Sequence, residues 1–191
     1  MDDEALLARS RHGDRDAFAV LVSRYQDELY TMALRMLASP ADAADVVQET
    51  FLRAYTRLPE LRGTSVRGWL YRVAVNCSHD VHRRVSRRPA DPLEDAAGNI
   101  VDLPDPGLGP EASALQRERL AAVRDALLSV PEVFRAAIVL RDVNDLSYEE
   151  IADALRVPVG TVRSRLNRGR TMLAAALRGT SLFAAHAEEE C

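Results

Sequence analysis

The chain has 191 residues with a net charge of −4, of which 47% are apolar and 28% charged, so we expect a folded protein of one ordinary domain or two small ones. No window approaches the roughly 18 uninterrupted apolar residues of a membrane span, and the acidic start, soon broken by Arg, His and Gly, is not that of a secretory signal. Two cysteines, Cys77 and Cys191, exclude a disulfide framework, and the expected location is the cytoplasm.

Arginines are concentrated in two places on this otherwise acidic chain. Residues 156–170 hold five arginines and no acid, and residues 72–88 hold five arginines with Asp80 as the one acid. Such islands matter more for nucleic-acid binding than the net charge of the whole chain. The distribution therefore predicts two basic surfaces.

The first half is predicted to be helical throughout. Apolar residues recur at helical spacing over 16–37, which predicts a long amphipathic helix. Ser39 followed by Pro40 suits an N-cap and the first position of a second helix, which ends before Pro59. A third helix is expected from Val66 to about residue 86.

The middle of the chain differs from the rest. Residues 89–113 hold five prolines, three glycines and six acids without a base, and a stable helix does not tolerate that density of proline and glycine. The segment is predicted to be a solvated linker. Helical periodicity resumes over 111–130, and Pro131 begins a further helix.

These patterns predict an all-α protein of two small helical domains joined by an acidic, Pro/Gly-rich linker. The expected division is a first domain at 1–88, a flexible linker at 89–113, a second domain at 114–179 and a disordered tail at 180–191. Cys191 lies in that tail, where it is expected to be exposed.

The most specific stretch is LSYEEIADALRVPVGTVRSRLNRGR, residues 146–170. Ser147 and Glu150 fit a capping box, so a helix is expected to begin at Tyr148. Pro158 ends that helix within a tight turn, and Gly160 opens a second helix. Two short helices joined in this way, the second rich in arginine, predict a DNA-binding helix-turn-helix.

The second of these helices carries side chains suited to reading DNA. Arginine and asparagine can bind guanine and adenine edges through two hydrogen bonds, while other arginines and a threonine suit phosphates. The alternative is an amphipathic helix with a basic, solvated face. The predicted contacts are Thr161, Arg163, Ser164, Asn167, Arg168 and Arg170.

The stretch AVNCSHDVHRRVSRR, residues 74–88, raises the question of a metal site. Cys77 falls on an apolar stripe of the predicted helix, and His79 lies about 200° away from it on a helical wheel, so the two cannot share an ion. His79 and His82 are neighbours on the helix without an evident third ligand. No catalytic constellation is present either, so we expect no metal, no cofactor and no enzyme activity.

The other face of that helix is polar and basic. It carries Asn76, Asp80, Arg83 and Arg84, and the aromatic residues Trp69 and Tyr71 precede it. Cations that neutralise phosphates beside rings that receive unstacked bases are typical of single-stranded DNA binding. The alternative is that both aromatic residues belong to the core.

Two signatures in fixed order resemble the extracytoplasmic-function (ECF) group of bacterial RNA polymerase sigma factors. They are DAADVVQETFLRAY with RGWLYRVAVN…HRR in the first half, and LSYEEIADALRVPVGTVRSRL in the second. The match runs from about residue 14 to 177. The resemblance implies that the first domain is sigma region 2 and the second is sigma region 4.

The resemblance also implies partners. The chain would bind core RNA polymerase, through its β′ clamp and β subunits, and promoter DNA, and relatives are commonly restrained by an anti-sigma factor. The acidic linker would thread the RNA-exit path of the polymerase. The implied polymerase contacts are Asp42, Asp45, Gln48, Glu49 and Leu52.

The implied DNA contacts fall on both domains. Asn76 matches the residue that helps to capture a flipped base of the minus-ten element, with Trp69, Asp80, Arg83 and Arg84 on the adjoining DNA path. The arginine-rich helix would read the minus-thirty-five element. The chain is thus expected to be a promoter-specificity subunit that nucleates DNA opening.

Two other functions remain open from the residues. The first is a stand-alone helix-turn-helix regulator whose first half senses or dimerises, which would need neither polymerase docking nor DNA melting. The second is a metal-dependent enzyme centred on His79 and His82, which a tightly held ion would support.

Overall fold

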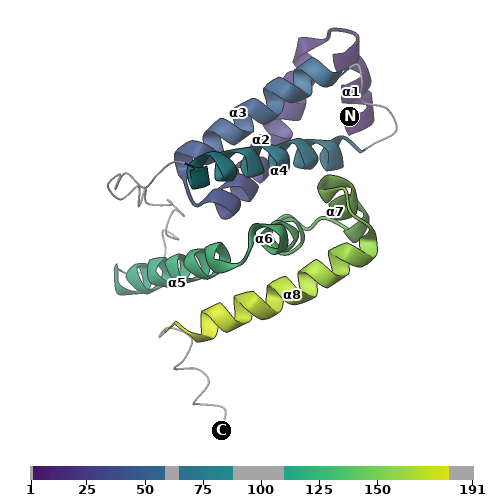
Figure 1. Ribbon diagram of the computed structural model, residues 1–191. Helices are drawn as coiled ribbons and strands as arrows, with labels where there is room; N and C mark the ends of the chain where they lie inside the picture. The colour runs from purple at the N-terminus through teal and green to yellow at the C-terminus, as the bar shows by residue number, and fades with distance from the viewer. Residues whose placement is uncertain (1, 59–64, 88–109, 181–191) are drawn as a thin grey trace.

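The structure, a computed structural model, describes residues 2–58, 65–87 and 110–180, and most of these residues are in α-helices (Figure 1). These residues contain no strand, which confirms the all-α prediction. None of their helices is both long and apolar enough to cross a membrane. Most of the predicted linker and nearly all of the predicted tail, with Cys191, lie outside the described residues.

Four helices form the amino-terminal half: α1 (Asp3–Arg11), α2 (Arg15–Leu37), α3 (Pro40–Arg57) and α4 (Val66–Arg87). Side-chain oxygens of Asp2, Asp14 and Ser39 accept hydrogen bonds from the backbone N–H groups three residues later, which satisfies donors that the helix itself leaves free. The sharp turn between α2 and α3 places Ala38 in the left-handed region, at φ 55°. This turn folds α3 back against α2.

The carboxy-terminal half contains α5 (Pro110–Ser129), α6 (Glu132–Ile138), the π-helix η2 (Val139–Val143), α7 (Tyr148–Leu155) and α8 (Val159–Arg178). The capping box at Ser147 and Glu150 is present in both directions. Arg156 takes the left-handed conformation that ends α7, and Pro158 precedes α8. The predicted helix-turn-helix is therefore confirmed as α7 and α8.

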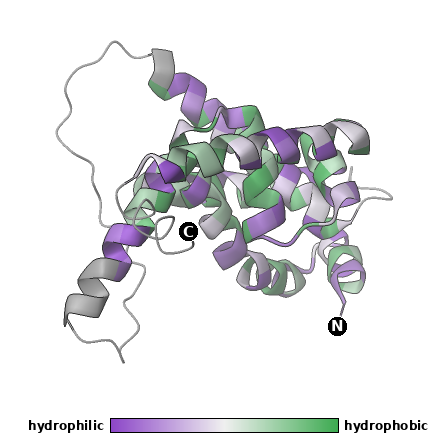
Figure 2. Ribbon diagram, turned by 90° about the horizontal axis from the view of Figure 1, so that it is seen from below, coloured by the Kyte–Doolittle hydropathy of each residue, from purple (hydrophilic) through white to green (hydrophobic). Residues whose placement is uncertain are grey.

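Buried apolar residues form one continuous cluster that extends through both halves of the described chain. Leu29 and Met32 of α2, Tyr71 of α4 and Ile151 of α7 are completely buried. Each such side chain stabilises the fold by roughly 1.5–3 kcal/mol relative to exposure. Figure 2 shows hydrophobic residues along the inward sides of the helices and hydrophilic residues outside.

The two halves pack against each other. α7 lies against α4, while α6 and η2 lie against α2, and Figure 1 shows α5 to α8 stacked beneath the α1 to α4 layer. The periodicity of the sequence did not predict this contact. It matters for function because α4 carries the face that the sequence assigns to DNA.

Two helix boundaries differ from the prediction. Helix α1 was not predicted, although Asp2 caps its first turn. Residues 110–113, where the predicted linker and the predicted helix 111–130 overlap, belong to α5, and Pro110 is tolerated because proline at a first helical position costs no hydrogen bond. The other predicted helices lie within about a turn of their observed bounds.

Close packing of α8 on α6 leads to a prediction about stability. A Cβ on Gly169 would lie 2.9 Å from Ile138 Cδ1 and 3.2 Å from Phe134 Cβ. Gly169→Leu should therefore lower the free energy of unfolding by about 1–3 kcal/mol or more through overpacking, measured by chemical denaturation followed by circular dichroism. Gly160→Leu is the matched control, because nothing lies within 4 Å of a Cβ there. Equal stability of the two variants would contradict the packing described.

Candidate nucleic-acid interface

The exposed surface of α8 carries most of the residues predicted to read DNA. Val162 and Leu166 anchor the helix in the core, and this directs Arg163, Ser164, Asn167 and Arg168 outward, where all four are exposed. Thr161 is half-buried in the first turn, where its carbonyl accepts a hydrogen bond from Ser164 Oγ at 2.9 Å. The structure thus brings these five side chains onto one helix, with four of them open to solvent.

Arg170, unlike the other residues of α8 predicted to contact DNA, is bound by a carboxylate. Its Nε donates to Asp142 Oδ2 at 3.0 Å, and its Nη2 donates to Asp142 Oδ1 at 2.5 Å. This paired hydrogen bond raises the pKa of Arg170 and directs its guanidinium toward η2. In this conformation Arg170 fixes α8 to η2 and is not presented for base contact.

Tyr148 orients two arginines at the start of the helix-turn-helix. The guanidinium of Arg163 lies 5.9 Å from the centre of the Tyr148 ring, and that of Arg141 lies 5.4 Å from it. Stacking of this kind limits the freedom of a long side chain. Arg163 is therefore partly preorganised at the N-terminal end of α8, where phosphate binding is also favoured by the helix dipole.

On α4, Asn76 faces the carboxy-terminal half. It is exposed, and it lines a cavity of about 140 Å³ together with His79, Ala154, Arg156 and Arg165. Trp69 is half-buried and packs against the core cluster. Of the two aromatic residues that precede the basic stretch, Tyr71 is completely buried, so the core interpretation holds for Tyr71 and applies in part to Trp69.

Asp80, Arg83 and Arg84 lie one to about two turns beyond Asn76 on α4. Asp80 accepts a hydrogen bond from Arg83 at 2.5 Å and lies 3.7 Å from Arg53 of α3. Asp80 and Arg84 line a groove between α3 and α4. Of the residues predicted for the minus-ten surface, Asn76 thus lines the small cavity, and Asp80 and Arg84 line the groove.

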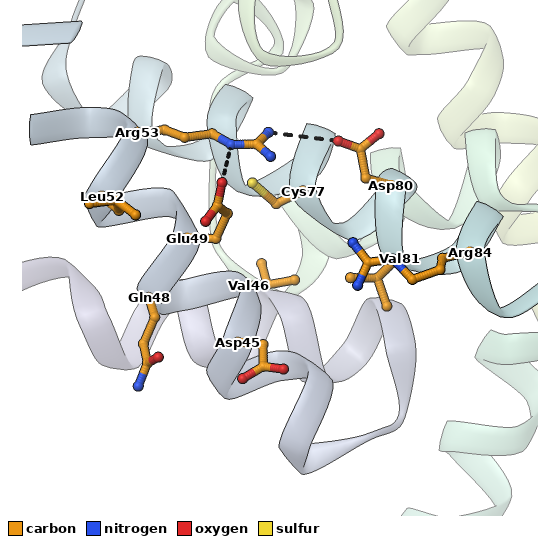
Figure 3. A pocket seen from close by; sticks show the side chains of 10 residues that line it. All are labelled: Asp45, Val46, Gln48, Glu49, Leu52, Arg53, Cys77, Asp80, Val81 and Arg84. Atoms are coloured by element: carbon orange, nitrogen blue, oxygen red, sulfur yellow. Dashed lines mark hydrogen bonds and ion pairs between the residues drawn. The ribbon is translucent and has the colours of Figure 1, made fainter. Parts of the chain in front are cut away.

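The groove between α3 and α4 also contains most of the predicted polymerase contacts (Figure 3). It encloses about 600 Å³, with Val46, Cys77 and Val81 as its apolar lining. On its α3 side lie Asp45, Gln48, Glu49 and Leu52.

Exposure and pairing distinguish those four side chains. Asp45 and Gln48 are exposed, and Leu52 retains 60% of its surface, which is unusual for a large apolar residue and typical of a binding surface. Glu49 accepts a hydrogen bond from Arg53 at 2.6 Å, which raises the pKa of Arg53. Asp42 stands apart from the groove lining, in the first turn of α3, where its backbone N–H donates to Ser39 Oγ.

In the 74–88 stretch, Cys77 packs in the core and His79 lies beside a carboxylate of α6. Burial raises the pKa of the Cys77 thiol, so it is held as a neutral apolar residue. His79 Nδ1 lies 2.8 Å from Glu132 Oε1, at ion-pair distance but without the alignment of a hydrogen bond. No three His, Cys, Asp or Glu residues converge as a metal-binding group in the described part of the chain.

Several interacting residues were missed by the sequence reasoning. Arg135 of α6 is buried and donates to the backbone carbonyl of Met36 in α2, and Arg67 of α4 donates to the backbone carbonyl of Asn144. The available signal for Arg135 was a lone charge inside the apolar run VFRAAIVL. Arg67 and Asn144 carried no comparable signal, since both types are common on exposed surfaces.

Two family models match the chain, and they cover most of both helical halves. Sigma-70 region 2 matches residues 21–88, and Sigma-70 region 4 matches residues 120–173. The first includes α3 and α4 with the groove, and the second includes the helix-turn-helix.

Curated relatives match almost the full length. The chain is 40% identical over 180 residues to the ECF RNA polymerase sigma-E factor of Haemophilus influenzae, covering 91% of this chain and 94% of the relative. It is 37% identical over 181 residues to the RNA polymerase sigma-H factor of Pseudomonas aeruginosa, covering 92% and 94%.

Solved structures share the fold. CnrH in complex with the cytosolic domain of CnrY superposes with a TM-score of 0.71 at 28% identity, covering 94% of this chain and 99% of that one. The sigma factor RpoE from Bartonella quintana, solved with the anti-sigma factor NepR, gives a TM-score of 0.63 at 21% identity, covering 85% and 97%.

Proposed function

This chain belongs to the sigma-70 family, in its ECF group, and is a promoter-specificity subunit of bacterial RNA polymerase; from that premise we propose which of its surfaces serves each step of initiation. We assign residues 1–88 to sigma region 2, 114–179 to region 4 and 89–113 to the connecting linker. One observation carries the assignment. The exposed residues of α8 predicted to contact DNA lie in the part that matches the region 4 model, and the groove between α3 and α4 lies in the part that matches the region 2 model.

Region 4 binds the minus-thirty-five element through α8. Its exposed residues Arg163, Asn167 and Arg168 point away from the core, as a helix lying in the major groove requires. Arg163, stacked on Tyr148, is placed for a phosphate or the first base contact. Arg170 acts in support of this surface by joining α8 to η2.

A substitution on α8 tests this assignment. Arg168→Ala should weaken binding to a minus-thirty-five duplex by about 1–3 kcal/mol if Arg168 reads a base. Fluorescence anisotropy on a duplex selected by the wild-type protein measures the effect, and Arg178→Ala, an exposed change further along the same helix, is the control. An equal effect of both variants would show that Arg168 supplies only general charge.

Region 2 captures the opened minus-ten strand at α4. Asn76 can donate and accept hydrogen bonds at the edge of a flipped base, which offsets part of the few kcal/mol that unstacking costs. Arg83 and Arg84 are exposed about two turns further along α4, where they neutralise backbone phosphates. Trp69, half-buried, supplies packing and the edge of this surface rather than a free stacking platform.

The groove between α3 and α4 docks on core polymerase. Leu52, exposed among Asp45, Gln48 and Glu49, provides an apolar centre with a polar rim, as protein interfaces commonly do. Asp42 extends the same surface toward the start of α3. Co-elution of the protein with core polymerase tests the docking, and failure to form that complex would overturn it.

The remaining properties follow from this role. We propose that the protein is non-catalytic, needs no cofactor and works in the cytoplasm with the polymerase. We also propose an anti-sigma partner, supported by the solved RpoE relative, which is bound to the anti-sigma factor NepR. A stand-alone regulator is not favoured, because the region 2 match covers α3 and α4.

A further inference from the structure

The small cavity between α4 and the helix-turn-helix is rich in hydrogen-bond donors, and the described residues that line it include no Asp or Glu. We propose that this cavity is a binding site for one phosphate group, held by the guanidinium groups of Arg156 and Arg165 and by the side-chain amide of Asn76. The inference rests on the cavity and its side chains, and it goes beyond the promoter role proposed above.

The donors come from elements that are far apart in the sequence. Asn76 and His79 belong to α4. Arg156 follows the last residue of α7, and Arg165 lies in α8. A guanidinium presents five N–H donors and an asparagine amide presents two. A tetrahedral oxyanion accepts hydrogen bonds from several directions at once, so donors on three separate elements suit it.

The two arginines have no acid of their own. In the part of the chain that the structure describes, neither guanidinium takes part in a hydrogen bond or an ion pair, although Arg165 is half-buried. Arg53 and Arg170, by contrast, are each paired with a carboxylate. A partly desolvated cation without a counter-charge is unfavourable, so an anion is the ligand that these two side chains lack.

Arg156 stands at a position where glycine is usual. Its φ of 53° lies in the left-handed region, which helix C-termini commonly reach through a residue without a Cβ. The carboxyl end of α7 carries the negative end of the helix dipole, which disfavours an anion, and the charge of Arg156 at that end offsets the dipole. A glycine would satisfy the backbone but would remove this cation from the cavity.

Apolar walls strengthen each charged contact. Val75, Ala136 and Ala154 line the cavity and are at most 3% exposed. They exclude water on that side, and a charge-assisted hydrogen bond is stronger in a low dielectric. Glu132 is the acid that the site must tolerate, because its Oε1 lies 2.8 Å from Nδ1 of the lining residue His79. Two guanidinium groups oppose its single charge.

The volume of the cavity limits the ligand to a small ion or group. It is about 140 Å³, and one water needs roughly 10–15 Å³ by this measure, so there is room for one phosphate group and a few waters. Sites that enclose a whole small molecule measure roughly 300–1,000 Å³. A nucleoside therefore stays outside, and the phosphate is either a free ion or the backbone group of a nucleic-acid strand.

The larger groove between α3 and α4 shows what distinguishes this cavity. That groove also contains arginines, but Asp45, Glu49 and Asp80 line it as well, and Glu49 neutralises Arg53 at 2.6 Å. An anion would meet three carboxylates there, whereas no described residue on the wall of the cavity carries one. Phosphate binding should therefore be confined to the cavity.

Nuclear magnetic resonance of the full-length, ¹⁵N-labelled chain tests the site with inorganic phosphate as the probe. Sodium phosphate replaces sodium chloride at constant ionic strength, so that general screening stays fixed. We expect the side-chain amide signals of Asn76 and the Nε–H signals of Arg156 and Arg165 to shift along one saturation curve. The Nε–H signal of Arg178, exposed in the last turn of α8, should not move.

Variants assign the effect to the cavity. Arg165→Met should weaken phosphate binding by about tenfold or more, the effect of losing hydrogen bonds from a charged group, and Arg156→Met should act in the same direction. Arg178→Met is the matched control and should keep the wild-type affinity. If circular dichroism shows Arg165→Met to be unfolded, Asn76→Ala decides, because it truncates an exposed side chain and should weaken binding by about threefold or more.

The other outcomes are distinct. Equal shifts in chloride and phosphate, or unchanged affinity in the cavity variants, would overturn the site. If inorganic phosphate is silent but a short single-stranded oligonucleotide moves the same Asn76 and Arg165 signals, the phosphate comes from a DNA backbone, and silence of both probes overturns the proposal. A chain that shows the phosphate shifts but forms no polymerase complex sinks the proposed function and leaves this site intact.

Discussion

Asn76→Ala should reduce promoter opening by about tenfold or more while leaving the affinity for duplex promoter DNA unchanged. Asn76 is exposed on α4, so its truncation removes no packing. The lost hydrogen bonds to a flipped base, worth about 1–3 kcal/mol, are needed only after the base leaves the stack. The effect should therefore appear at the opening step.

Fluorescence of 2-aminopurine placed in the minus-ten element measures opening, and a filter-binding assay measures duplex affinity. Asn167→Ala is the matched control, since it makes the same chemical change at an exposed position of α8. It should weaken duplex binding instead. Equal losses in both assays for Asn76→Ala would contradict a specific role in base capture.

Asp45→Arg should weaken binding to core polymerase by several kcal/mol, or about a hundredfold or more, because like charges opposed across an interface cost energy of that order. Asp45 is exposed at the groove between α3 and α4, so reversing its charge leaves the core intact. Surface plasmon resonance with immobilised core polymerase measures the affinity.

The control for this variant is Asp27→Arg, which reverses a charge at an exposed position of α2 outside the groove. Its affinity should match that of the wild-type chain. If both variants bind equally weakly, net charge rather than a defined docking surface governs the association. If Asp45→Arg binds as well as the wild-type chain, the polymerase contact lies elsewhere.

Local structure was predictable because its causes are local. Ser39 with Pro40 and Ser147 with Glu150 marked the beginnings of α3 and α7, since capping depends on residues three positions apart. Apolar spacing located the buried side of α2. The missed helix α1 is short, and its apolar pattern is too brief to be read by periodicity.

The contact between the halves was not predictable from such signals. Arg135 donates a hydrogen bond to the backbone carbonyl of Met36, which lies 99 residues away in the sequence. No spacing rule relates residues at that separation. Arg84 belongs to the groove with Cys77 because it lies seven residues, nearly two full helical turns, after that cysteine. Arg170 was expected to read DNA, but no local pattern indicated its pairing with Asp142.

These findings give the chain two separable surfaces. The residues of α8 predicted to read DNA are exposed, and Asn76 of α4, also exposed, lines the cavity beside the carboxy-terminal half.

The most direct test of the central claim is transcription of fragmented genomic DNA from the source organism by core polymerase with and without the purified protein. We predict new RNA 5′ ends that appear only with the protein and share elements near −10 and −35, and we predict that Asn76→Ala loses them. No new 5′ ends with a chain that is folded by circular dichroism would contradict the account.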